Sequence, residues 1–204
     1  MSAISIVGYH TCRNEGGYEH IFKSIPFLSR PGPNQWLTQG YYFWTDSPYW
    51  AEDWLRNQDN KVISRFIATF DDCNKLLDLV GNVEHQIEFT ELIEIVIEEM
   101  GITNSLSLSV NQVVSFFREH SDKTQFKGLF DYVAIKAADQ KSVQSIKFIE
   151  PRKKRNDQDK PYVPNLRLIT RQQLCVFENA KSCFKFDGFH SPENFQDQFN
   201  KCSN

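Results

Sequence analysis

The hydrophobic positions along this chain follow two spacings, one typical of helices and one typical of strands. After Val83, apolar residues recur at 89, 92, 93, 96, 97 and 100, which places them on one face of an α-helix. A second stripe of this kind follows Ser109 and contains Val110, Val113, Val114 and Phe117. We therefore expect a helix in each of these two segments.

Short apolar runs rich in aromatic and β-branched residues predict strands on both sides of these helices. They cover residues 4–10, 41–44, 61–70, 75–79, 132–137, 145–149 and 174–177, with 183–186 as a further candidate. A short helix is expected over 18–25. Another is expected to begin at Ser47-Pro48 and to carry Ala51 and Trp54, because serine caps helices and proline suits their first position. The polar segment 151–165, with three prolines, predicts a long, mobile loop.

Helices inserted among many strands, without internal repeats, predict an α+β fold built on antiparallel sheets. The length of 204 residues, with 40% hydrophobic and 14% aromatic content, suits a single domain over 1–204. No apolar run approaches the roughly 20 residues that cross a bilayer, so no membrane partner is expected. The first eight residues are uncharged and read as a strand rather than a secretory signal, which favours a cytoplasmic location.

Cysteine usage and charge narrow the possibilities further. The five cysteines are odd in number and contain no C-x-x-C pair, which argues against a disulfide framework and a zinc site. Cys175 lies in an apolar run and is expected to fill the core. The net charge is −3, yet residues 136–171 hold ten basic and four acidic residues, a local charge of +6 that leaves −9 elsewhere. This asymmetry predicts a face that meets polyanions, with a solvated basic loop as the alternative.

Three positions near strand ends carry candidate chemistry: His10 in Gly8-Tyr-His-Thr11, Tyr42 in Gly40-Tyr-Tyr-Phe43, and Gln173 at the start of the last apolar run. Each alone is typical of a structural residue, because strand-end histidines are usually hydrogen-bonded and aromatic runs are usually core. Motifs for triphosphatases, zinc proteases, Rossmann enzymes and serine hydrolases are absent from the sequence.

Together, these positions resemble the His-Tyr-Glu class of ADP-ribosyltransferases, which includes diphtheria-toxin-like and poly(ADP-ribose) polymerase-like enzymes. The family's strand-His-Gly-Ser/Thr motif is similar to Tyr9-His10-Thr11. Its Gly-x-Tyr-Phe motif, with Ala nine residues after the Tyr, resembles Gly40, Tyr42, Phe43 and Ala51, and its late Glu aligns with Gln173. The resemblance runs from residue 4 to about 178. It implies a split antiparallel β-sandwich with inserted helices.

The resemblance also implies an activity, namely cleavage of NAD⁺ at the nicotinamide bond and transfer of ADP-ribose to a macromolecule, without a metal. By resemblance, His10 would bind the adenosine ribose, the Thr11 backbone the nicotinamide amide, and Gln173 the other ribose. The Tyr42 ring would stack on nicotinamide, since stacking and cation–π attraction both suit a flat, partly cationic heterocycle. The expected NAD⁺-binding set is His10, Thr11, Tyr42, Trp50, Ala51 and Trp54.

The chain departs from the family pattern at several of these positions. Thr11 stands where many relatives have Gly. Trp50 and Asp53 replace the Ser and Tyr of polymerase-like members, which makes Trp50 or Trp54 the expected second stacking surface. Gln173 replaces Glu and carries no charge to stabilise an oxocarbenium ion, which disfavours chain elongation.

The third motif leaves alternatives open. Single transfer remains possible with Glu178 or Glu150 nearby, and so does a module that binds NAD⁺, ADP-ribose or RNA without turnover. Gln172 is the alternative to Gln173, because alternation along a strand would place only one of them in the site.

The acceptor is expected to be nucleic acid, RNA or DNA, because Arg152, Lys153, Lys154 and Arg155 shortly precede Gln173 and such clusters bind phosphates. A protein acceptor is the alternative. Small transferases of this kind often act as toxins in toxin–antitoxin or anti-phage systems, so the analogy also implies an antitoxin protein as a partner.

Overall fold

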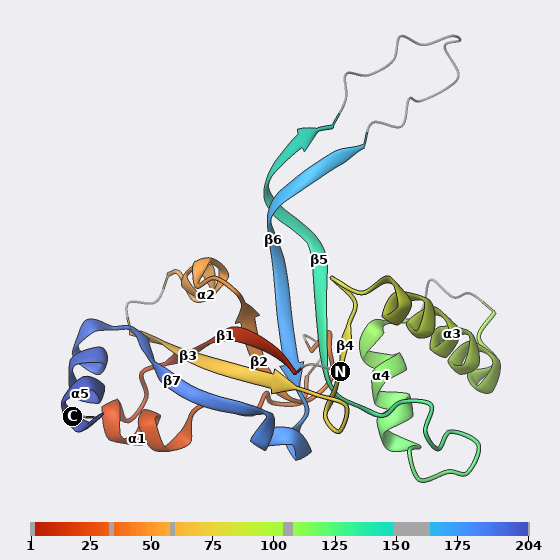
Figure 1. Cartoon of the computed structure of the whole chain (residues 1–204), viewed down its shortest axis with the longest axis horizontal. Coiled ribbons are helices and arrows are strands. Elements are labelled where there is room, and N and C mark those ends of the chain that lie inside the picture. The colour runs from red at the N-terminus through yellow and green to blue at the C-terminus, as the bar shows by residue number, and fades with distance from the viewer. Residues whose placement is uncertain (1–2, 33–34, 58–59, 104–107, 149–163, 204) are drawn as a thin grey trace.

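The computed structural model describes residues 3–32, 35–57, 60–103, 108–148 and 164–203, and their seven strands form one hydrogen-bonded sheet in the order β4-β5-β6-β2-β1-β3-β7 (Figure 1). The strands are β1 (Ile4–Arg13), β2 (Tyr41–Thr45), β3 (Lys61–Phe70), β4 (Lys75–Asp78), β5 (Tyr132–Lys147), β6 (Asn165–Val176) and β7 (Phe184–Ser191). The helices are α1 (Gly17–Ser24), α2 (Tyr49–Asp53), α3 (Val83–Met100), α4 (Val110–Glu119) and α5 (Glu193–Ser203), with a 3₁₀ helix over Glu178–Cys183. Only β4 and β5 pair in parallel among the described strands, so the predicted α+β class is confirmed.

The two helices predicted from their apolar stripes are confirmed, and both begin at polar caps. The Asn82 side chain accepts hydrogen bonds from the first turn of α3. Ser109 forms a capping box with Gln112 at the start of α4. The buried residues of the two helices are Phe89, Leu92, Val96, Val113, Val114 and Phe117, all from the predicted stripes. None of the described helices is both long and apolar enough to cross a membrane.

Several predicted boundaries are wrong. Helix α2 begins after Pro48, which is its N-cap rather than its first residue, and it ends before Trp54. The expected strands 132–137 and 145–149 are one strand, β5, and β6 begins already at Asn165. The reason is that the polar residues of these segments pair with each other across an antiparallel ladder, which needs no apolar face. The expected loop over 151–165 lies, apart from its last two residues, outside the described part of the chain.

The sheet consists of two halves that meet at β1 and β2. Strand β1 pairs with β3 over ten positions but with β2 at only two, Gly8 with Thr45 and Tyr9 with Trp44. In Figure 1, β1, β3 and β7 run across the direction of β5 and β6. A Cβ at Gly8 would lie 2.8 Å from Cβ of Phe43, so glycine permits the close contact at this joint. Beyond Tyr9, β1 diverges from β2.

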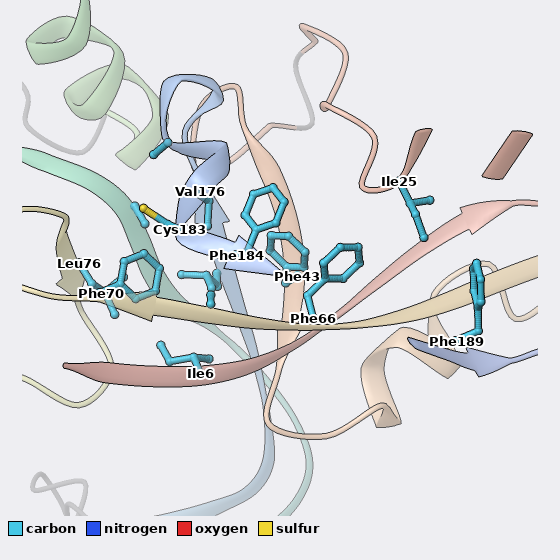
Figure 2. Close-up of a cluster of buried hydrophobic side chains, with 14 of the residues drawn as sticks. Ile6, Ile25, Phe43, Phe66, Phe70, Leu76, Val176, Cys183, Phe184 and Phe189 are labelled. Carbon is cyan, nitrogen blue, oxygen red and sulfur yellow. The ribbon is translucent and has the colours of Figure 1, made fainter. Parts of the chain in front are cut away.

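The buried hydrophobic residues of the described chain form two large clusters and a smaller one. The first cluster extends across both halves of the sheet and brings phenylalanines of β2, β3 and β7 together with Ile25, Leu76 of β4 and Val176 of β6 (Figure 2), and Phe195 of α5 joins it. The second cluster packs α3 and α4 against β4, β5 and β6, with Leu77, Ile135 and Cys175 fully buried. Burial raises the pKa of the Cys175 thiol to about 12, so this cysteine is an uncharged part of the core. All five cysteines are free.

Candidate functional site

A cleft of about 980 Å³ opens where β1 diverges from β2. Residues His10–Arg13 of β1 line one wall. The other walls come from Tyr42 and Trp44 of β2, from Arg171 and Gln173 of β6, and from the loops around Phe27 and Trp36. The three motif residues, which are far apart in the sequence, therefore line one cavity together.

His10 is held by the backbone on both sides of its ring. Its Nδ1 lies 3.0 Å from the carbonyl oxygen of Tyr42, and its Nε2 lies 3.2 Å from the backbone nitrogen of Phe27. Because a carbonyl can only accept and an N–H can only donate, Nδ1 carries the proton and Nε2 accepts. Burial lowers the pKa of His10 below 6.5, although the bond to Tyr42 opposes this, so the ring is neutral at pH 7.

These contacts give His10 a structural role as well as a place in the cleft. The imidazole joins β2 to the segment around Phe27, which forms another wall. A ribose hydroxyl that binds Nε2 would have to replace the Phe27 N–H as its donor.

Tyr42 lines the cleft, and its hydroxyl, at the far end of the ring, is fixed by the loop before β2. The hydroxyl donates to the carbonyl of Thr38 at 2.7 Å and accepts from the backbone N–H of Leu37 at 3.2 Å. Burial raises the pKa of this phenol, so it stays protonated. The arrangement makes the ring a rigid surface, suited to stacking rather than to proton transfer.

Gln173 lies in the cleft beside Trp36. Its Oε1 accepts a hydrogen bond of 2.8 Å from Nε1 of Trp36, and its backbone pairs with Trp44 on one side and Ala137 on the other. Gln172 is not among the residues that line the cleft, and its Nε2 donates to Oγ1 of Thr170. Strand alternation thus brings Gln173, and not Gln172, into the cavity.

The residues expected around α2 divide into two groups. Trp54 is half exposed and lines the cleft beside Trp44, with the ring centroids 5.7 Å apart. Trp50 and Ala51 are buried and do not line it. Nε1 of Trp50 donates to the carbonyl of Thr170, and the carbonyl of Ala51 accepts from the Thr11 hydroxyl. Trp50 and Ala51 therefore hold α2 against β6 and β1.

Three arginines and one acid set the charge of the described cleft wall. Arg13 lies 3.8 Å from Glu15 in an exposed ion pair, and Arg171 pairs through Nε and Nη2 with Asp139, which lowers the pKa of that carboxyl although desolvation opposes it. Arg30 also lines the cleft. With Arg13 and Arg171 in ion pairs, Arg30 leaves the described wall with a net positive charge, which suits an anionic ligand.

The other charged residues that the sequence analysis expected near the site lie outside the cleft or outside the described residues. Glu178 is outside the cleft and pairs with Arg118 at 2.5 Å. Glu150 and Arg152, Lys153, Lys154 and Arg155 lie outside the described residues. No group of His, Cys, Asp or Glu in the described ranges is arranged to hold a metal ion.

Sequence reasoning did not find Trp36, Trp44, Arg13, Arg30 or Arg171 as cleft residues. Trp36 follows a turn-rich segment without periodicity, and its contact with Gln173 spans 137 positions in the chain. Arg171 had a usable signal, because it lies two residues before Gln173 and strand alternation gives both side chains the same face.

No family model, curated protein or solved structure matches the chain.

Proposed function

We propose that this chain is an NAD⁺-dependent mono-ADP-ribosyltransferase with an ADP-ribosyltransferase-type fold. The observation that carries the proposal is that His10, Tyr42 and Gln173, which align with three separate motifs of the family although Gln173 stands in place of Glu, line a single cleft. The resemblance of the motifs and the geometry of the cleft are independent of each other.

The walls of the cleft suit the parts of a dinucleotide. Tyr42, Trp36, Trp44 and Trp54 offer aromatic surface for nicotinamide and adenine, and arginines at the same cleft suit the pyrophosphate. The volume of about 980 Å³ lies at the upper end of the range for small-molecule sites, roughly 300–1,000 Å³. These features support NAD⁺ as the ligand.

The proposed reaction breaks the bond between C1′ of the ribose and the nicotinamide nitrogen, and the bonding pair leaves with nicotinamide. C1′ then accepts a lone pair from an oxygen or nitrogen of the acceptor, which loses a proton to water. Gln173 carries no charge, so its contribution is to hold the ribose through hydrogen bonds. The rigid Tyr42 ring holds nicotinamide in the strained pose from which it leaves.

We propose a nucleic acid as the acceptor and a cytoplasmic toxin or anti-phage effector, silenced by an antitoxin protein, as the biological role. The support is the basic charge near the third motif. Lys147 and Arg167 lie on the described parts of β5 and β6, beyond Gln173, and the segment Arg152–Arg155 lies between these strands in the sequence. Lysines and arginines on strands that lead into the cleft suit a polyanionic acceptor. A protein acceptor remains the alternative.

A binding module for NAD⁺, ADP-ribose or RNA without turnover is the second candidate. The observation that favours it is the state of Gln173, whose Oε1 is engaged by Trp36 and which offers no negative charge. The only carboxylate of the described cleft wall, Glu15, is ion-paired with Arg13.

The experiment uses NAD⁺ labelled in the nicotinamide ring, with release of free nicotinamide and the calorimetric Kd measured on the same samples. We expect the parent to release label, Tyr42→Ala to lose binding and release, and Gln173→Ala to lose release by about tenfold or more. Gln172→Ala is the matched control, since its side chain lies outside the cleft. Binding without release in the parent, across RNA, DNA and protein acceptors, would establish the module instead.

The acceptor is identified by mass spectrometry of total RNA, DNA and protein after expression, with a search for the added ADP-ribose. Substitution of all four residues Arg152, Lys153, Lys154 and Arg155 by Gln should weaken transfer to nucleic acid and leave the Kd for NAD⁺ unchanged. ADP-ribose found only on proteins would reject the nucleic-acid acceptor while keeping the transferase.

A further inference from the structure

A second hollow, of about 550 Å³, shares the loop 35–39 with the cleft. Gln35 lines both cavities, Trp36 lines the cleft, and Thr38 and Gln39 line the second hollow. Arg118 of α4 also lines the second hollow but not the cleft. The loop therefore connects a helix outside the site with the aromatic wall inside it.

Arg118 binds this loop at two points. Its Nη1 donates to Oγ1 of Thr38 at 3.2 Å and to the carbonyl of Gln39 at 3.0 Å. Its Nη2 pairs with Glu178, and its guanidinium lies 4.3 Å from the centre of the Phe177 ring. The guanidinium is thus fixed from one side by Glu178 and Phe177, and its other donors face the loop.

The loop needs such support because Thr38 has a positive φ of 70°. A β-branched residue in this region is strained and persists only where its surroundings hold it. The hydroxyl of Thr38 contacts Arg118 and lies 3.0 Å from Oγ of Ser115. Both partners belong to α4, so this helix holds the strained residue in place.

The strained residue is also the one that fixes Tyr42. The carbonyl of Thr38 accepts the 2.7 Å bond from the Tyr42 hydroxyl, and the preceding residue, Leu37, donates its N–H to the hydroxyl oxygen of Tyr42. Trp36, one residue further, binds Gln173. Movement of Thr38 would therefore displace two of the groups that face the ligand.

We propose that Arg118 is a positioning residue for NAD⁺, which acts through Thr38 on the Tyr42 ring and on the Trp36–Gln173 pair. This inference rests on the proposed function. Arg118 holds the loop in the strained conformation before the ligand arrives, so the aromatic wall needs no ordering when the ligand binds.

The test compares Arg118→Met, which keeps length and contact with Phe177 but removes all donors, with Arg118→Lys and with Glu178→Gln. The Kd for NAD⁺ and the quenching of tryptophan fluorescence by acrylamide are measured for each. Quenching is read in a Trp54→Phe background, because Trp54 is the most exposed cleft tryptophan and would mask Trp36. We expect Arg118→Met to raise the Kd by about tenfold and to increase quenching. Arg118→Lys should recover part of both, and Glu178→Gln should stay within about twofold of the parent because it leaves the bonds to the loop.

A second variant keeps the test valid if Arg118→Met does not fold. Thr38→Ala removes the hydroxyl that Arg118 binds but keeps a Cβ, so a φ of 70° stays strained. Arg118 keeps its bond to the carbonyl of Gln39, so the fold should persist. We expect its Kd for NAD⁺ to rise and its quenching to increase as in Arg118→Met.

The two readouts separate this inference from the proposed function. A parent that does not bind NAD⁺ overturns the proposed function, and the ligand-free quenching then judges Arg118 by itself. Unchanged quenching in Arg118→Met or Thr38→Ala overturns the positioning role in either case. Increased quenching with an unchanged Kd overturns it too, because the wall would then be mobile without consequence for the ligand.

Discussion

Strands β5 and β6 lie in two environments along their length. Near the cleft they are enclosed, since β6 pairs with both β5 and β2 there and Leu174, Cys175 and Val176 are fully buried. Further out they pair only with each other and extend away from the body as a two-stranded arm (Figure 1). Large apolar side chains of this arm are exposed, among them Ile146 at 53% and Leu168 at 39%.

The boundary between the two environments coincides with the candidate site. Gln173 is the first residue of β6, counted inward from the arm, that pairs with strands on both sides. Gln172 pairs with β5 alone. The backbone of Gln173 is fixed by hydrogen-bonded strands on both sides, and the residue lines the cleft. A group that must hold a ligand needs such rigid support.

The largest expected effect is the removal of a side chain from the enclosed part. Leu174→Ala leaves a cavity in a site that is fully buried, and such changes cost about 2–5 kcal/mol. Urea denaturation of the purified protein measures the loss. A loss below about 1 kcal/mol would mean that the enclosed part is packed no better than the arm.

Gly40→Ala should act on the same region from the side of β2. A Cβ at this position would lie 2.5 Å from Sγ of Cys175 and 2.6 Å from the carbonyl oxygen of Val176, and the backbone oxygen cannot move away without disturbing β6. We expect a loss of about 1–3 kcal/mol in the free energy of unfolding. Gly128→Ala is a contrasting control, since its Cβ would meet nothing within 4 Å and only its positive φ of 80° would be strained. If the two variants lose equal stability, close packing does not explain why glycine occupies position 40.

His10 gives the wall of the cleft a dependence on pH. Its pKa is below 6.5 in the folded protein, so as the pH falls below 6.5 the unfolded chain takes up a proton that the folded chain does not. His10 therefore does not affect the pH dependence of stability well above pH 6.5, and stability falls as the pH drops below 6.5. Urea titrations from pH 7.5 to 5 compare the parent with His10→Gln. Parallel curves for the two proteins would show that His10 is not a buried neutral group.

Local patterns were sufficient to predict most elements and to select His10, Tyr42 and Gln173, which line one cleft, but they missed other cleft residues such as Trp36 and Arg171. The stripes of α3 and α4 depend on spacing within one helix. The motif residues were found through the family resemblance, and in the structure they lie within β1, β2 and β6 rather than at the strand ends expected for His10 and Gln173. Helix α5 was missed although a signal existed, since Phe195 and Phe199 are one turn apart after Ser191-Pro192.

Contacts between distant segments could not be predicted in this way. Arg118 reaches Thr38 across 80 positions, and nothing in the sequence around either residue indicates the contact. For the same reason, the sequence did not show that the inner part of β6 is buried while its outer part is exposed. Leu166-Arg-Leu168 alternates as a half-buried strand does, but its burial depends on whether another strand lies beside it.

Mutations in the arm should change the free energy of unfolding least. The size of this change shows whether the arm is exposed to solvent or covered in solution. Leu168→Ala truncates a side chain that is 39% exposed among the described residues, so the free energy of unfolding should change by less than about 0.5 kcal/mol and the Kd for NAD⁺ should not change. Light scattering at several protein concentrations accompanies the urea titration. If Leu168→Ala costs as much as Leu174→Ala, the arm is covered in solution. Since an isolated two-stranded hairpin is marginally stable at best, a loss that grows with protein concentration would identify a second copy as the cover.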